Sequence, residues 1–70
     1  MNGREFVARV RKLARKRGIA ARFDETRGKG SHGTIYFGSR WTIVKDRKKD
    51  LGKGLLHKML RDLGIDSSEL

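Results

Sequence analysis

The stretch that decides the fold is Thr34-Ile35-Tyr36-Phe37-Gly38-Ser39-Arg40-Trp41-Thr42-Ile43-Val44-Lys45. β-branched and aromatic residues dominate both of its halves, and such residues favour strands. The segment between the halves is too short for a crossover connection, so the two strands must be antiparallel neighbours. The stretch therefore predicts a β-hairpin with strands at 34–37 and 41–45, joined around residues 38–40.

Two registers are open to this hairpin. A two-residue loop pairs Phe37 with Arg40, whereas a three-residue loop pairs it with Trp41. The longer loop also sets Ile35 opposite Ile43 and so gathers the large apolar side chains on one face. We therefore predict the three-residue loop, with Trp41 in the core. The residues left for the opposite, open face are then Thr34, Tyr36, Thr42 and Val44.

A helix is predicted before the hairpin, over residues 2–17. Asn2 is a suitable N-cap with Glu5 three residues later, and Gly18 supplies the left-handed stop. The apolar residues recur at helical spacing and form one buried stripe: Phe6, Val7, Val10, Leu13 and Ala14. Cations line the exposed side, most regularly Arg4, Arg11 and Arg15, and we expect these three to contact a polyanion.

Two more elements complete the chain. Residues 19–24 alternate between apolar and polar side chains, which predicts a half-buried strand. A second helix is expected at 52–63, ended by Gly64, with a buried stripe of Leu55, Leu56, Met59, Leu60 and Leu63. The predicted fold is α+β in the order α-β-β-β-α, a three-stranded antiparallel sheet with both helices on one face. Residues 1–65 form a single domain, and residues 66–70 are predicted to be a flexible tail.

Charge indicates the kind of partner. The 70 residues include 18 Lys and Arg against eight Asp and Glu, a formal net charge of +10. Such an excess concentrates polyanions at the surface, so nucleic acid is the expected partner. The chain has no cysteine and two histidines far apart in sequence, so neither disulfides nor a metal or other cofactor is expected. No segment resembles a membrane span or a signal peptide, which predicts a cytoplasmic protein without a membrane partner.

One histidine has an unusual setting. Arg27-Gly28-Lys29-Gly30-Ser31-His32-Gly33 leads directly into the first strand of the hairpin. His32 has the same strand parity as Thr34 and Tyr36, so we expect it on the open face, away from the core. His57, in contrast, lies off the apolar stripe of the second helix and is interpreted as a surface residue.

Cleavage of RNA without a metal fits this setting. A neutral imidazole at His32 would take the proton of a ribose 2′-hydroxyl, whose oxygen then attacks the adjacent phosphate. Arg27 and Lys29 would stabilise the charge of the phosphorane, and Ser31 would either donate a hydrogen bond to phosphate or stabilise the turn. Tyr36 is the expected platform for stacking a base. DNA lacks the 2′-hydroxyl, so this chemistry selects RNA.

A resemblance to a known family supports this interpretation. The element order, the Gly28-Lys29-Gly30-Ser31-His32 run before an aromatic strand, and Lys49-Asp50-Leu51-Gly52-Lys53-Gly54 opening the second helix together resemble the HicA toxins. The opening Asn2-Gly3-Arg4-Glu5-Phe6 fits the family as well. HicA toxins are small mRNA interferases with a fold like that of double-stranded-RNA-binding domains. The chain departs from them at Gly33, where many members have a second histidine, and at Leu55, where many have threonine.

The resemblance implies an endoribonuclease toxin of a type II toxin–antitoxin system, active in the stress response. His32 matches the catalytic histidine of the family. The implied protein partner is a HicB-type antitoxin that covers the His32 face. Two other classes of function remain open: a non-catalytic module that binds double-stranded RNA, and a basic subunit that binds an acidic protein.

Overall fold

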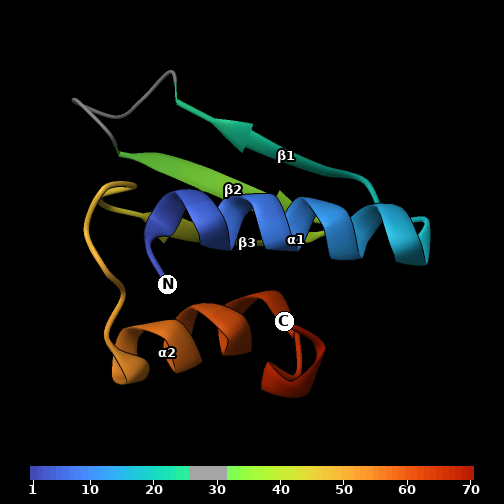
Figure 1. The fold of residues 1–70 in the computed structure, drawn as a ribbon. Coiled ribbons are helices and arrows are strands. Elements are labelled where there is room, and N and C mark those ends of the chain that lie inside the picture. Colours follow the sequence, from blue (N-terminus) through green and yellow to red (C-terminus); the bar gives the residue numbers. More distant parts are fainter. Residues whose placement is uncertain (26–31) are drawn as a thin grey trace.

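The computed structural model describes residues 1–25 and 32–70 of the chain. Its three strands form one antiparallel sheet in the order β1-β2-β3, and both helices lie on the same side of it (Figure 1). The predicted α-β-β-β-α fold is therefore confirmed. The elements are α1 (Gly3–Arg17), β1 (Ala21–Asp24), β2 (Gly33–Phe37), β3 (Arg40–Val44) and α2 (Lys53–Leu63), followed by a 3-10 turn, η1 (Ser67–Glu69).

Helix α1 begins and ends as its sequence predicts. The side chain of Asn2 accepts a hydrogen bond from the amide of Glu5 at 2.8 Å, and Gly18 ends the helix with φ 69°. The amide of Ile19 donates back to the carbonyl oxygen of Ala14 at 2.8 Å, which satisfies a carbonyl of the last turn. Because this amide belongs to the helix end, β1 starts at Ala21 rather than at residue 19.

The predicted hairpin register is wrong. Phe37 pairs with Arg40 and Ile35 with Thr42, so the loop consists of Gly38 and Ser39 alone. Gly38 has φ 63°, and a positive φ at the first loop position is what a tight two-residue turn requires. The shorter loop turns β3 over relative to the prediction. Thr42 and Val44 are buried at 2% and 0% exposure, whereas Trp41 and Ile43 lie on the open face at 55% and 51%.

Helix α2 covers the β3 side of the sheet. Its buried residues are Met59, Leu60 and Leu63, and Gly64 ends it with φ 70°. Leu55, predicted to belong to the buried stripe, is 44% exposed, because the side of α2 that faces the core carries Leu56, Met59, Leu60 and Leu63. The hydroxyl of Thr42 donates to Asp62 at 2.9 Å and so ties β3 to this helix.

The core fills the space between the sheet and the two helices. Phe6 and Val10 of α1, Ile35 of β2, Val44 of β3 and Met59 of α2 are all at or below 1% exposure. The other face of the sheet carries no helix in the described part of the chain. It presents Arg22, Thr34, Tyr36, Trp41 and Ile43.

The C-terminal residues, predicted as a flexible tail over 66–70, form the turn η1 in the structure. Asp66 caps it by accepting from the amide of Ser68 at 3.0 Å. Glu69 pairs with Arg17, and the guanidinium of Arg9 donates to the carbonyl oxygen of Leu70 at 2.9 Å. These contacts dock the segment on α1. Neither helix has the length and apolar character needed to cross a membrane, as far as the described residues go.

Candidate nucleic-acid interface

His32 immediately precedes β2 and is exposed to solvent. The next residue, Gly33, is buried and pairs with Val44 of β3. A side chain at Gly33 would collide with the ring of Phe23, whose Cε2 atom would lie 2.8 Å from an added Cβ. The packing of Phe23 over Gly33 thus fixes the start of β2 and, with it, the backbone that carries His32.

Arg47 supports this corner of the sheet. Its guanidinium lies 5.1 Å from the centre of the Phe23 ring and donates to Glu25 at 2.9 Å. The carbonyl oxygen of Arg47 accepts from the amide of Arg4 at 3.0 Å. Arg47, which sequence reasoning missed, therefore joins the end of β1 to the start of α1.

Three of the predicted site residues, Arg27, Lys29 and Ser31, lie outside the described residues. The glycines at 28 and 30 do so as well. Their predicted contacts with phosphate stay predictions.

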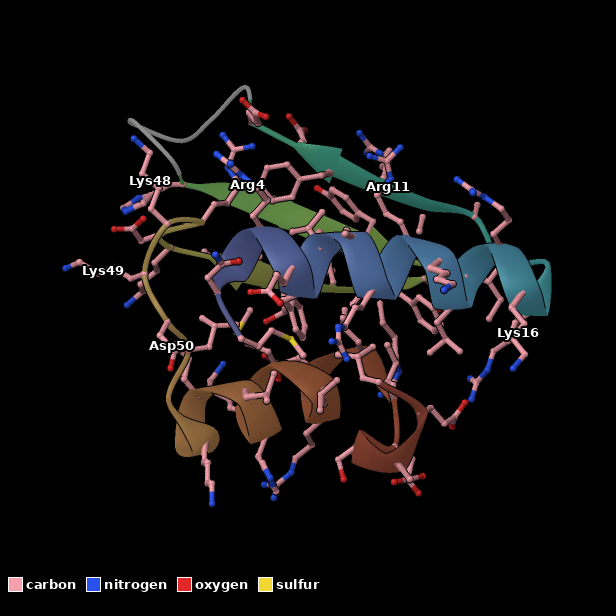
Figure 2. All side chains as sticks on the ribbon, viewed as in Figure 1. Arg4, Arg11, Lys16, Lys48, Lys49 and Asp50 are labelled. Carbon is pink, nitrogen blue, oxygen red and sulfur yellow. The ribbon has the colours of Figure 1, made fainter. Side chains whose placement is uncertain are left out.

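Arg4 lies at the same end of the molecule as His32. The start of α1 packs on the segment after β3, since a Cβ at Gly3 would lie 2.8 Å from the carbonyl oxygen of Asp46 and 2.9 Å from Val44. Val44 in turn pairs with Gly33, the neighbour of His32. Lys48 and Lys49 extend into solvent at this end too (Figure 2). These lysines belong to the charged connector that follows β3, and the antiparallel hairpin places the end of β3 beside the start of β2 and so beside His32.

Arg11 and Arg15 are exposed, as predicted, but they lie further along α1. A rise of 1.5 Å per residue places them about 10 and 16 Å from Arg4 along the helix axis. Both line a shallow groove between α1 and β1, together with Ala21. No ion pair found within residues 1–25 and 32–70 engages Arg4, Arg11 or Arg15. These three guanidinium groups form the helical part of a positive surface.

The open face of the sheet carries a row of planar side chains. Arg22, Tyr36 and Trp41 are direct cross-strand partners, so all three project from the same face. The guanidinium of Arg22 stacks on the ring of Tyr36 at 4.3 Å from its centre. Trp41 is more than half exposed beside it. The prediction that Tyr36 lies on the open face is confirmed. The prediction that Trp41 lies in the core is wrong.

The spacing along β2 separates the row from the histidine. Tyr36 comes three residues after Gly33, which is about 10 Å at the rise of a strand, and His32 lies one residue further away. Tyr36 is therefore too far from His32 to exchange a proton with it directly. A nucleotide chain bound along β2 would instead contact the two residues with different nucleotides.

Among the described residues, the remaining titratable groups form no second cluster. His57 is exposed on α2, as predicted. Within the ranges that the structure describes, no group of three or more His, Cys, Asp or Glu side chains is placed to hold a metal ion. A scan against models of known protein families finds no match, and comparison with curated proteins and with solved structures finds none either.

Proposed function

We propose that this protein is an endoribonuclease that cleaves mRNA with His32 as general base, the toxin of a type II toxin–antitoxin pair. It would act in the cytoplasm without a metal ion. Its neutralising partner would be a HicB-type antitoxin that covers the His32 face. The proposal rests first on the resemblance carried by the sequence motifs around His32 and the start of α2.

One structural observation supports it best. The exposed His32 lies at the end of the molecule that also presents Arg4, Lys48 and Lys49, and next to a sheet face that carries the half-buried Tyr36 and the exposed Trp41. Cations attract and hold the phosphates of a polynucleotide, and aromatic rings stack its bases. A general base between these two kinds of surface is suitably placed to act on the backbone of a bound single strand.

The reaction proceeds by internal attack. The imidazole of His32 removes the proton of a ribose 2′-hydroxyl, and the 2′-oxygen forms a bond to the adjacent phosphorus. The bond from phosphorus to the 5′-oxygen of the next nucleotide breaks, which leaves a 2′,3′-cyclic phosphate and a free 5′-hydroxyl. Nearby cations stabilise the additional negative charge on the phosphorane. The imidazolium of His32 can return its proton to the departing 5′-oxygen.

Gly33 bears on this proton transfer. Many HicA toxins have a second histidine at the matching position, but here the Phe23 ring and the carbonyl oxygen of Asp24 occupy the space that a side chain would need. Gly33 is also buried, so a side chain there would point away from the exposed side of His32. We infer that His32 serves as both base and acid in this protein.

The nature of the cleavage products tests the proposed function. The purified protein is incubated with a single-stranded RNA in EDTA, and the products are analysed by mass spectrometry. We expect fragments that end in a 2′,3′-cyclic phosphate, and no cleavage of an RNA whose riboses all carry 2′-deoxy or 2′-methoxy groups. Cleavage that requires a divalent metal, or that proceeds on the 2′-methoxy strand, would exclude this mechanism.

A non-catalytic RNA-binding module is the second candidate. The observation in its favour is the line of exposed arginines on α1, Arg4, Arg11 and Arg15, which suits phosphates along a duplex. It predicts tight binding of double-stranded RNA with no cleavage under any condition. The product analysis therefore separates the two candidates.

A further inference from the structure

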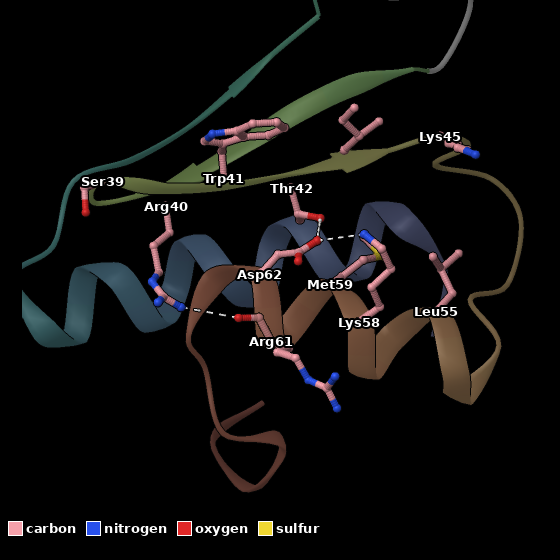
Figure 3. Close-up of a pocket in the computed structure, with 11 residues that line it drawn as sticks. Ser39, Arg40, Trp41, Thr42, Lys45, Leu55, Lys58, Met59, Arg61 and Asp62 are labelled. Atoms are coloured by element: carbon pink, nitrogen blue, oxygen red, sulfur yellow. Dashed lines mark hydrogen bonds and ion pairs between the residues drawn. The ribbon is translucent and has the colours of Figure 1, made fainter.

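A groove lies between strand β3 and helix α2. It has a volume of about 870 Å³ and is lined by β3, by the turn before it and by one side of α2 (Figure 3). Three large hydrophobic side chains that line the groove are exposed to solvent: Trp41 at 55%, Ile43 at 51% and Leu55 at 44%. Exposed apolar side chains gathered in one groove of a small, highly charged protein indicate a surface that a partner covers.

The floor of this groove is the edge of a sheet. β3 pairs with β2 on one side only, and in the described part of the chain no strand occupies its other side. Half of its amide and carbonyl groups therefore face outward, as a template for a further strand. The residues Trp41 to Val44 are all strong strand formers and include no charge.

The opposite edge of the sheet is different. β1 spans four residues, and two of them, Arg22 and Asp24, are charged and project from the open face. Charged residues on a short edge strand discourage the addition of another strand. The two edges of the sheet thus differ, because the charges of β1 lie within the strand, whereas the one charge of β3 is at its first residue, Arg40, and leaves Trp41–Val44 uncharged.

The positive charge of the groove indicates an acidic partner. Its lining includes the cations Arg40, Lys45, Lys58 and Arg61 against the single carboxylate of Asp62. That carboxylate already accepts from Lys58 at 3.0 Å and from Thr42 at 2.9 Å. Figure 3 shows Trp41 above β3 and Thr42 below it, with Lys58 and Asp62 on the helix beneath. A strand added here would meet apolar side chains on one of its faces and cations on the other.

We propose that this groove binds an extended, acidic segment of a partner protein, which adds to β3 as a fourth strand. Alternate side chains of the segment are apolar and cover Trp41 and Ile43. The intervening side chains are carboxylates that pair with the cations of α2. A second copy of this chain would bring cations against cations, and RNA has no aliphatic groups for Ile43 and Leu55. The inference does not depend on RNA cleavage.

A short synthetic peptide tests this proposal on the full chain. The probe has about eight residues of alternating valine and glutamate, long enough to span a typical strand. The control peptide has the same composition, with the valines in one block and the glutamates in another. We expect only the alternating peptide to shift the backbone amide resonances of Arg40–Val44 in the ¹⁵N-labelled protein. The emission of Trp41, the single tryptophan of the chain, should move to shorter wavelength as it is covered.

Three protein variants separate strand addition from simple charge attraction. Ile43→Lys adds a cation at the groove, so it should strengthen binding if charge alone matters. The proposal instead predicts a loss of affinity of about tenfold or more, as expected when a buried aliphatic side chain leaves an interface. Ala20→Lys adds the same charge at an exposed position outside the groove and should change affinity by less than about twofold. Leu55→Lys repeats the test on α2 without altering the strand.

Three outcomes would overturn the proposal. Equal binding of the block peptide, together with undiminished binding by Ile43→Lys, would reduce the groove to a charged surface. Shifts of the β3 amides by oligouridylate but not by the peptide would assign the groove to RNA. A dimer of the free protein in sedimentation that Ile43→Lys dissociates would assign it to a second copy of the chain.

Discussion

Gly33 shows how a single residue determines the position of the candidate base. An added Cβ would lie 2.8 Å from Phe23 Cε2 and 2.9 Å from the carbonyl oxygen of Asp24, both closer than such atoms approach in folded proteins. The ring cannot move freely, since the guanidinium of Arg47 stacks on it and also binds Glu25. This cluster holds the backbone next to His32 in place.

Gly33→Ala should therefore lower the free energy of unfolding by about 1–3 kcal/mol, the usual cost of overpacking. Urea denaturation followed by circular dichroism measures the change. Gly54→Ala is the matched control, because an added Cβ there meets nothing within 4 Å. Alanine also favours a helix over glycine, so this control should be as stable as the wild type or up to about 1 kcal/mol more stable. Equal stability of the two variants would contradict the packing described for Phe23.

Between elements, Asp62 joins α2 to β3. Hydrogen bonds from Lys58 and from Thr42, in that order of strength, lower the pKa of the Asp62 carboxyl below its ordinary value of 3.8. The Thr42 hydroxyl is buried, whereas the Asp62 side chain is 35% exposed. A carboxyl whose pKa is lowered by folding stabilises the protein above its unfolded pKa, and this stabilisation disappears as the pH falls through the folded pKa.

Asp62→Asn should consequently make the protein less stable at neutral pH and less sensitive to acid. We expect the difference in melting temperature between wild type and variant to be largest above pH 5 and to shrink as the pH falls below 3.8. Thermal unfolding across this range measures it. A difference in melting temperature that stays the same at every pH would show that the carboxylate does not connect α2 to β3.

The exposed face of α1 carries Arg11 and Arg15, which are expected to bind phosphate. If Arg11 and Arg15 each bind a phosphate, their replacement by alanine should weaken RNA binding and reduce its dependence on salt. The slope of log K against log salt concentration falls by about 0.7 for each phosphate of a single strand that the protein no longer neutralises. Arg17→Ala is the control on the same helix, since Arg17 pairs with Glu69. An unchanged slope in the double variant would remove α1 from the interface.

The elements themselves could be predicted from the sequence, because their signals are local. Asn2 and Gly18 bound α1, and Gly64 ends α2, as the capping rules require. The predicted hairpin register is wrong because the two-residue turn, and not the matching of Ile35 with Ile43, determines the pairing. Gly38-Ser39 was the available signal, since a glycine followed by a small polar residue is typical of two-residue hairpin loops. The exposure of Trp41 and Leu55 depends on that register and on where α2 crosses the sheet, and neither is a local property.

For the whole molecule, the arrangement of the layers matters most. Both helices lie on one face of the sheet and leave Tyr36 and Trp41 on the other, so a strand of nucleic acid can reach the rings without displacing an element. A net charge of +10 would attract such a strand over a long range. The sequence predicted that one face of the sheet is open and that Tyr36 lies on it. The polyanionic partner indicated by the charge stays a prediction. The antiparallel hairpin already places the segment after β3 at the His32 end. The sequence did not show that Arg4 joins it, because that proximity arises from the packing of α1 on this segment.

The most direct test of the proposed function compares two histidine variants in an RNA cleavage assay that contains EDTA. Both His32 and His57 are exposed, so replacing either by alanine should leave the circular dichroism spectrum and the melting temperature close to those of the wild type. We predict that His32→Ala lowers the cleavage rate by about 100-fold or more, the usual contribution of a general base, while His57→Ala cleaves at nearly the wild-type rate. Cleavage by a folded His32→Ala variant at the wild-type rate would contradict the assignment of His32 as the catalytic base.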